Sequence, residues 1–420
     1  MIRPTGRIFY GWWIVLASGG IQLLSGVLWM QSYGAYMVLL QADFGWSKTV
    51  VSGAFAMTRV ESGILGPLQG WLVDRYGPRA ILRIGIVLFG LGFMALSQIN
   101  TIITFYLAFA MIAIGSSLGG FATLMVGIVS WFNKNRAKAI SISQIGFSAG
   151  GLSVPIVILC LELFGWRATA FSSGVLVLLL GLPLAQVVRH KPEPYGEVQD
   201  GYDEEVRNDD QTSEPVEPER DFTAREAMRT RAFWLISVGH ASALLTVSAI
   251  MVHLVPHLTE GLDFTLTEAG AVVALMTACQ MFGQLYGGYL GDRLDKRFIC
   301  IACMLGHVSG LLLLAYASSL TMVVAFALLH GTAWGMRGPL MVALRADYFG
   351  PSSFGTIMGF SSLIVMFGMS SGALIAGVMA DISGSYQSGL TLLAIAAFLG
   401  SFCFLMATPP AQPASMPSKP

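Results

Sequence analysis

Three charged residues lie within long apolar stretches of this sequence: Arg59, Glu61 and Arg337. An ionisable group in such a stretch is costly to bury, so it usually faces a cavity or pairs with another residue. A guanidinium carries its donors in a planar fork that matches the two oxygens of a carboxylate. We therefore predict that Arg337, and also Arg59, bind an anionic group of a small-molecule substrate. The alternative is an ion pair with Glu61 that only holds helices together.

Glu61 is the candidate for a group that carries a coupling proton. Burial favours the neutral form of a carboxyl group, whereas a nearby arginine favours the ionised form, and the sequence leaves both forms open. Arg59 and Glu61 are two residues apart. This spacing places them on different faces of a helix, so they are poor partners for each other.

Uncharged polar side chains in the same apolar stretches extend the predicted pocket. Those expected to contact the substrate are Gln280, Gln284, His240, His330, Gln144 and Tyr33. For each histidine, a hydrogen bond between helices is the alternative. His253 and His257 are spaced by one helical turn, but two ligands do not make a metal site. We predict no metal and no other cofactor.

No motif in the sequence indicates catalysis. There is no phosphate-binding loop of the ATPase type, no Ser, His and Asp in the order of a nucleophilic triad, and no cluster of metal ligands. A soluble basic patch with interleaved aromatic residues, which would indicate nucleic-acid binding, is also missing. We predict a protein that is not an enzyme and binds no nucleic acid.

The composition places these residues in a lipid bilayer. Of the 420 residues, 55% are hydrophobic and 11% are charged, against about 25% charged in soluble domains. A helix needs about 20 apolar residues to cross the hydrocarbon core, and only helices or closed barrels satisfy their backbone there. The long continuous runs predict an all-α polytopic membrane protein with twelve spans: 10–40, 48–74, 80–98, 101–131, 138–163, 168–189, 231–259, 266–291, 298–317, 319–346, 354–380 and 386–407.

Lysine and arginine are distributed unevenly between the predicted loops. If the N-terminus is cytoplasmic, the cytoplasmic loops hold nine of these residues and the outside loops hold only Lys48 and Arg167. This bias predicts a multi-pass protein of the cell (inner) membrane with both termini in the cytoplasm.

Six predicted spans lie on each side of a polar segment. We predict an N-terminal six-helix bundle at 1–189, an acidic linker at 190–228, a C-terminal six-helix bundle at 229–408 and a disordered tail at 409–420. The linker contains thirteen Asp or Glu residues and four prolines, a composition that cannot bury a core and is typical of disordered chain. A regulatory docking role for the linker is the alternative.

A charged turn between two spans occurs twice. Residues 70–79 read GWLVDRYGPR, and residues 288–297 read GYLGDRLDKR. Asp74 follows a helix C-terminus, where the helix dipole disfavours a carboxylate, so it should bind the N-terminus of another helix. The start of the eleventh span is the candidate, and Asp292 should meet the start of the fifth span in the same way. We predict a conformational latch made of Gly70, Asp74, Arg75, Gly77, Arg79, Arg136, Gly288, Asp292 and Arg293. A solvated basic loop that only sets topology is the alternative.

With this loop the chain resembles the major facilitator superfamily over nearly its whole length. The family's signature is a Gly, three residues, Asp, Arg, one residue, Gly and then a basic residue, and residues 70–79 match it. The second copy has Asp295 in place of the second Gly. The resemblance implies two pseudo-symmetric six-helix bundles that rock about one central site.

Shorter motifs resemble the bacterial monocarboxylate and oxalate–formate branch of that superfamily. They are Tyr10-Gly11-Trp12-Trp13, Trp131-Phe132-Asn133-Lys134-Asn135-Arg136 and Asp347-Tyr348-Phe349-Gly350. The branch often carries a carboxylate-binding Arg in the eighth span, where this chain has Gln280 and Gln284. We expect Arg337 to take over that role.

These observations predict a secondary active transporter of a small organic anion, monocarboxylate-like, which works by proton symport or exchange. We expect it to act as a monomer. One alternative is an exporter of larger amphipathic compounds, favoured by the 21 Met and 25 Phe residues. The other alternative is a non-transporting sensor built on the same fold.

Overall fold

The structure, a computed structural model, describes residues 8–46, 48–200 and 221–412. Its contacts divide the chain into two units, of which the first holds Met1–Pro218 with Pro351–Gly359 and the second holds Glu219–Gly350 with Phe360–Pro420. The described parts of both units are built of helices, and their one extended pairing is an isolated bridge between Phe132 and Asp200. The predicted domain boundaries stay a prediction.

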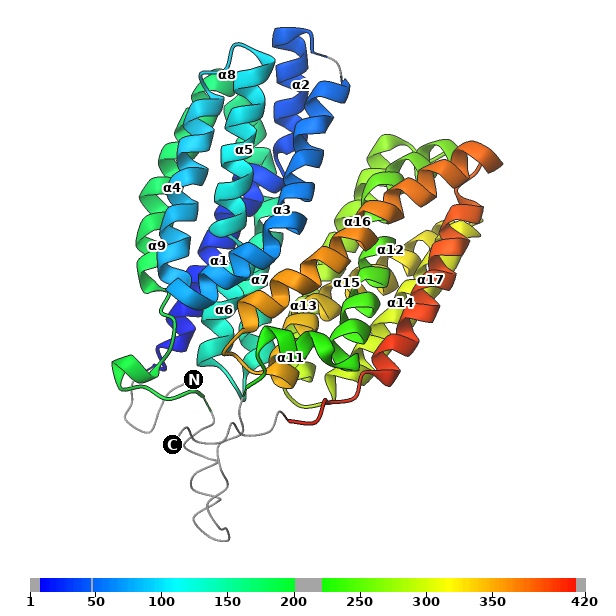
Figure 1. The fold of residues 1–420 in the computed structure, drawn as a ribbon. Helices are drawn as coiled ribbons and strands as arrows, with labels where there is room; N and C mark the ends of the chain where they lie inside the picture. Colours follow the sequence, from blue (N-terminus) through cyan, green and yellow to red (C-terminus); the bar gives the residue numbers. More distant parts are fainter. Residues whose placement is uncertain (1–7, 47, 201–220, 413–420) are drawn as a thin grey trace. The chain divides into compact units, whose positions relative to one another are not determined.

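The first unit is a bundle of long helices (Figure 1). Within it, α4 packs along α5 and α8, and α1 packs along α7. Its elements are α1 (Gly11–Ser25), a π-helical segment (Gly26–Met30), α2 (Tyr33–Phe44), α3 (Lys48–Tyr76), α4 (Pro78–Leu96), α5 (Ile102–Leu118), α6 (Phe121–Trp131), α7 (Arg136–Leu152), α8 (Val154–Leu176), a second π-helical segment (Val177–Gly181), α9 (Leu182–Val187) and a 3-10 turn (Glu193–Tyr195).

The second unit is also a helical bundle, in which α15 packs along α13 and α14 while α17 packs along α12 and α14. Its elements are α11 (Ala224–Arg229), α12 (Arg231–Gly261), α13 (Leu266–Gly291), α14 (Lys296–Ala315), α15 (Leu320–Phe349), α16 (Phe354–Ser383) and α17 (Gln387–Met406). The residues of α16 up to Gly359 belong to the first unit.

Nine segments of the described chain are long and apolar enough to cross a membrane. One of them, Arg136–Val187, corresponds to two of the predicted spans. The helix is kinked between the two at Gly165, whose φ of 76° is not helical. The other two predicted spans are α3 and α15, which are 29 and 30 residues long and carry charged side chains. Six crossings therefore fall in each unit, and the predicted all-α polytopic fold is confirmed.

Three of the predicted spans are interrupted, whereas the sequence predicts one long helix in each case. The fifth span, 138–163, is broken at Ser153 between α7 and α8. In the first span the helix widens at Gly26–Met30, and a new helix begins at Tyr33. In the fourth span α5 ends at Leu118, and Gly120 is extended before α6 begins. A break of two residues leaves an apolar run intact, so hydropathy does not reveal it.

The predicted disordered linker is partly ordered, which corrects that prediction. The guanidinium carbon of Arg189 lies 3.8 Å from the ring centroid of Tyr10 and 3.9 Å from that of Tyr195. At the other end, α11 begins with a capping box made by Thr223 and Glu226. Residues 201–220, and residues 413–420 of the predicted tail, lie outside the described residues. Partners in the folded protein, which composition cannot reveal, order the two ends of the linker.

Glycines let neighbouring helices touch backbone to backbone. A Cβ at Gly331 or Gly335 of α15 would overlap a carbonyl oxygen of α13, and a Cβ at Gly283 of α13 would overlap one of α15. In the first unit, a Cβ at Gly146 would overlap the carbonyl oxygen of Gly19. Such close approach is a common way for membrane helices to associate. It also fixes the rotation of α15, whose other face meets α14.

We predict that Gly335→Ala destabilises the protein, whereas Gly270→Ala on α13 does not. A Cβ at Gly335 meets the backbone of Gln280, which cannot move aside as a side chain could, while nothing lies within 4 Å of a Cβ at Gly270. Overpacking of this kind costs about 1–3 kcal/mol, and alanine is otherwise favoured over glycine in a helix by about 0.5–1 kcal/mol. The apparent melting temperature in detergent, measured at one heating rate, should fall for the first variant only. Equal melting temperatures would contradict this packing.

Candidate functional site

α15 carries two buried guanidinium groups, those of Arg337 and Arg345. Both side chains are 1% exposed. They are eight residues apart on one helix, which corresponds to roughly 12 Å between their Cα atoms. Two like charges at that distance repel each other by roughly 1.4 kcal/mol if the effective dielectric constant is about 20. The pair therefore does not stabilise the fold by itself, and each charge needs its own compensation.

Arg345 is held by three helices of the second unit. Its Nη1 donates to the carbonyl oxygen of Met341 at 2.8 Å, and its Nη2 donates to Oγ of Ser361 at 2.7 Å and to Nδ1 of His240 at 3.2 Å. Ser361 also shares a hydrogen bond of 2.9 Å with Ser237. A guanidinium has only donors, so Nδ1 of His240 must be the acceptor. The ring of His240 is therefore neutral, with its proton on Nε2.

Arg337 has no such partners. Its Nε and Nη1 atoms are buried and have no hydrogen-bond partner among the described residues. A buried charge without a partner costs several kcal/mol even after the protein relaxes. Arg337 is thus a guanidinium whose donors are unused by the part of the protein that the structure describes.

α14 and α15 also hold a pair of buried imidazoles, His307 of α14 and His330 of α15. Their Nδ1 atoms are 3.1 Å apart, and both side chains are 0% exposed. Both Nε2 atoms are buried without a hydrogen-bond partner among the described residues. His330 lies seven residues before Arg337 on α15. The second unit therefore holds a polar cluster of two buried guanidiniums, two buried imidazoles and the half-buried imidazole of His240.

The substrate-binding residues that the sequence predicts in the second unit fall into two groups. Arg337, His240 and His330 share the cluster on α12 and α15, and Gln280 and Gln284 lie on α13 with their backbones against Gly335. We expected Arg337 to face a central pocket, but its side chain is buried in the structure. The reason is that Gly335 packs on α13, and two residues further on the helix has turned by about 200°.

The predicted residues of the first unit have other surroundings. Tyr33 is 6% exposed and packs on Trp29 and Phe109 with ring centroids 5.6 and 5.5 Å away. Nε2 of Gln144 is buried and has no partner among the described residues. Glu61 is half-buried on α3, and the side chain of Arg59 lies outside what the structure describes. The roles of these residues stay predictions.

Sequence reasoning missed Arg345 and undervalued His307. Arg345 lies four residues before the end of α15, where an arginine usually extends to the membrane surface. Its position eight residues after Arg337, in a helix already marked by one charge, is the signal that could have identified it. Sequence reasoning gave His307 no functional role, and no local pattern links it to His330.

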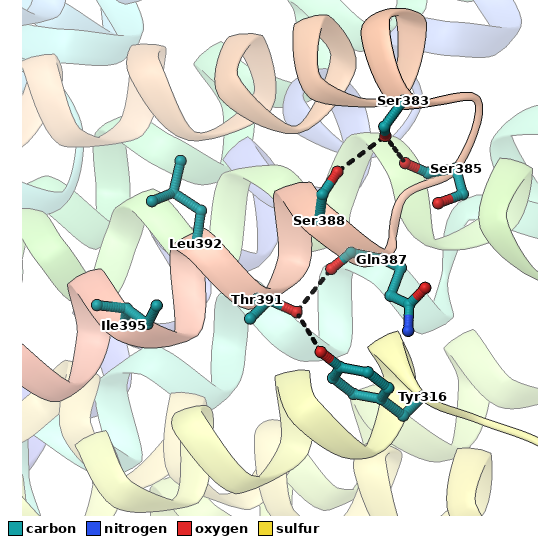
Figure 2. A pocket seen from close by; sticks show the side chains of 8 residues that line it. All are labelled: Tyr316, Ser383, Ser385, Gln387, Ser388, Thr391, Leu392 and Ile395. Atoms are coloured by element: carbon teal, nitrogen blue, oxygen red, sulfur yellow. Dashed lines mark hydrogen bonds between the residues drawn. The ribbon is translucent and has the colours of Figure 1, made fainter.

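A hollow in the surface of the second unit contains no charged group (Figure 2). It lies where α14 and α16 end and α17 begins, and it is lined by Tyr316, Ser383, Ser385, Gln387, Ser388, Thr391, Leu392 and Ile395. Its hydroxyls are used locally, because Ser383 shares a bond of 2.8 Å with Ser388 and Thr391 donates to the carbonyl of Gln387 at 2.7 Å. This hollow has no cation that would attract an anion.

The contact that the sequence predicts for Asp74 is present in the first unit. Its carboxylate accepts hydrogen bonds from the backbone N–H of Gly355 at 2.9 Å, and from the N–H and Oγ1 of Thr356 at 2.7 Å each. These amides belong to the first turn of α16, where the positive end of the helix dipole favours an anion. Gly70 permits the approach, since a Cβ there would overlap the carbonyl oxygen of Gly355.

The rest of the first charged loop is a tight turn. Gly77 has φ 80° and precedes α4, which begins with Pro78. Nε of Arg79 donates to the carbonyl of Val188 at 2.9 Å, and Arg75 is exposed.

The second charged loop starts its next helix differently. Asp295, which replaces the second glycine, caps α14 by accepting the N–H of Arg297 at 2.9 Å. The hydrogen bond from the Arg297 side chain lowers the pKa of the Asp295 carboxyl. Arg293 stacks on Tyr289, with 3.9 Å between the guanidinium carbon and the ring centroid. Gly288 is buried, and Asp292 ends α13.

An acidic residue of the linker occupies the start of α7. The carboxylate of Asp200 accepts the backbone N–H groups of Asn133, Lys134 and Asn135, the last two at 3.1 and 2.8 Å. Arg136 next to them is 4% exposed and donates to the carbonyl of Phe132 at 2.8 Å. The sequence predicts Asp292 at this helix start, and that contact stays a prediction.

The family model described as the Major Facilitator Superfamily matches residues 19–254 and 236–420. The chain belongs to the Major Facilitator Superfamily.

Relatives of this superfamily member cover nearly the whole chain. An MFS transporter of Aspergillus flavus, asaE, is 24% identical over 403 residues, which are 94% of this chain and 86% of the relative. Monocarboxylate transporter 11 of Mus musculus is 24% identical over 428 residues, covering 96% of this chain and 89% of the relative. The solved proton:xylose symporter XylE has a TM-score of 0.74 at 15% identity, over 95% of this chain and 96% of that one. The last similarity supports the fold.

We predict that Asp74→Ala lowers the stability of this superfamily member. The variant leaves the first amides of α16 without the charged acceptor, and a hydrogen bond to a charged group contributes about 1.5–3 kcal/mol. The control is Asp43→Asn, which changes an exposed carboxylate bonded by Arg167 and Trp166. Those bonds lower the pKa of Asp43, but an exposed pair adds little stability. Thermal unfolding should separate the two variants, and an Asp74→Ala protein as stable as wild type would refute the capping role.

Proposed function

We propose that this superfamily member is a secondary active transporter of a small organic anion, monocarboxylate-like, driven by proton symport or exchange. Its two bundles would expose one central site to each side of the membrane by turns. The loop charges support cytoplasmic termini. One relative is named a monocarboxylate transporter, which supports a carboxylate as the anionic group of the substrate.

The observation that carries the proposal is the unpaired guanidinium of Arg337. Its Nε and Nη1 donors are buried and unused by the described residues. An arginine that only holds helices together would have hydrogen-bond partners, as the Nη atoms of Arg345 have in Met341, Ser361 and His240. Nε of Arg345, like that of Arg337, has none among the described residues. An anion that reaches Arg337 would relieve the cost of its burial, and the planar fork would orient a carboxylate. Binding requires the helices around Arg337 to open, which fits a protein that alternates between conformations.

The predicted latch fits the same cycle. Asp74 holds the first turn of α16 through three hydrogen bonds, while the rest of α16 belongs to the second unit. Rocking of the bundles would break and re-form these bonds. Their strength would then set how long one conformation lasts.

The test is counterflow in proteoliposomes with formate, acetate, lactate, pyruvate and succinate as probes. We expect wild-type protein to exchange at least one of them. Arg337→Lys keeps the charge and loses the fork, so its half-saturation concentration should rise about tenfold. Arg337→Gln removes the charge and should lower the exchange rate by about tenfold to a hundredfold. Arg231→Gln, at an exposed position at the start of α12, is the matched control and should behave as wild type.

Protein stability separates substrate binding from a structural role. Removing one partner of a buried ion pair costs about 3–5 kcal/mol, whereas removing an unpaired buried charge costs nothing of that kind. We expect the melting temperature of Arg337→Gln to equal or exceed that of wild type. The proposal is wrong if no probe is exchanged, or if Arg337→Gln exchanges the probes at the wild-type rate.

A further inference from the structure

The His307–His330 pair has the geometry of two bases that can share one proton. The Nδ1–Nδ1 distance of 3.1 Å is that of an N–H···N hydrogen bond, and the ring centroids are 4.5 Å apart. α14 and α15 pack closely here, because a Cβ at Gly310 would meet the Cβ of His330 at 3.3 Å. His307 is twelfth of the 20 residues of α14, so the pair lies near the middle of a membrane span.

The hydrogen bond fixes the protons of the pair. One ring must carry a proton on Nδ1 and donate it, and the other must accept it with the Nδ1 lone pair. When both rings are neutral, the donor ring has a free lone pair on its Nε2, and the acceptor ring carries its proton on its own Nε2. Both Nε2 atoms are buried and have no hydrogen-bond partner among the described residues. The pair therefore offers one unused basic site and one unused donor inside the protein.

We propose that His307 and His330 together bind the proton that accompanies the anion. The proton adds to the free Nε2 lone pair, and the resulting imidazolium keeps its Nδ1–H bond to the second ring, which stabilises the charge. The reverse step releases the same proton after the conformational change. This inference rests on the proposed function, which it deepens by naming the proton site and its link to the anion site.

Arg337 supplies that link. It follows His330 by seven residues on α15, so the two side chains leave the same face of the helix about 10.5 Å apart. While its charge is uncompensated, Arg337 opposes a second positive charge on the pair. An anion bound to Arg337 cancels that field, and the pair can then take up a proton. By reciprocity, a protonated pair strengthens anion binding. One monoanion and one proton add no net charge, so the transport step is electroneutral.

The other titratable groups near the pair do not replace Arg337. The other titratable groups of α14 include the thiols of Cys300 and Cys303. The helices packed against α14 and α15 contribute the thiols of Cys279 on α13 and Cys403 on α17. His240 of α12 is held neutral by Arg345, and His257 is bonded to the carbonyl of Leu314 at 3.1 Å. The described carboxylates Glu268 and Asp347 of these helices lie in terminal turns.

The experiment compares two assays on the same proteoliposomes, with the five probe anions named above. Counterflow needs no net proton movement, whereas accumulation driven by a pH difference does. With the membrane potential clamped at zero and the inside one pH unit more alkaline, 1:1 symport accumulates the probe about tenfold. The variant His307→Asn, at a residue that is not among the predicted substrate contacts, should keep counterflow and lose most of the accumulation. The double variant His307→Asn/His330→Asn should lose all of it.

His253→Gln is the matched control, because its Nε2 is bonded to the carbonyl of Ala373 at 2.8 Å and lies outside the cluster. It should accumulate the probe as wild type does. Glu61→Gln tests the carrier that the sequence predicts. Melting temperatures confirm that each variant is folded.

Each result decides between the proposals. Accumulation by the double variant at the wild-type level, or loss of accumulation only in Glu61→Gln, would overturn the proton site. Counterflow without any accumulation by wild type would overturn it too, while leaving anion exchange intact. Absence of counterflow for every probe would overturn both proposals.

Discussion

A charge inside a hydrocarbon layer must be compensated by the protein or by a ligand, and this constraint shapes the second unit. Arg345 meets it with a carbonyl, a hydroxyl and an imidazole from three helices. Arg337, on the same helix, leaves Nε and Nη1 unused. The contrast within one helix is informative, because Arg345 shows what a structural arginine looks like and Arg337 can be compared with it. It makes the unpaired guanidinium the most direct indication of a ligand in the described chain.

The position of that guanidinium follows from backbone packing. Gly331 and Gly335 bring α15 against the carbonyl groups of α13, which sets the rotation of the helix about its own axis. Arg337, two residues beyond Gly335, then leaves α15 on the side away from α13. Small residues on one face of a helix thereby decide which polar groups meet on the other. In a membrane, where no water is present to solvate a misplaced charge, this control of helix rotation matters more than in a soluble core.

Helix starts are the second recurring element. Asp74 and Asp295 each bond the first amides of a helix, namely α16 and α14, and Asp200 bonds the three amides directly before α7. The chemistry is the same in all three cases, since free N–H groups and the positive end of the helix dipole attract a carboxylate. The differences lie in the distance along the chain. Asp295 caps its own helix, Asp200 reaches back from the linker, and Asp74 bonds residues that follow 281 and 282 positions later.

Hydropathy and the helix dipole are local properties, so the membrane fold, the twelve spans and the need of Asp74 for a helix start could be predicted from the residues alone. The position of Arg337 in an apolar run also marked it as an unusual charge. The partners of Arg345, the pairing of His307 with His330, and the contact of Asp200 with the residues before α7 follow only from the packed fold. These contacts depend on how each helix is rotated and where it breaks. Helix rotation is set by close packing between residues that are distant in the chain, so it cannot be predicted from the hydropathy of one apolar run.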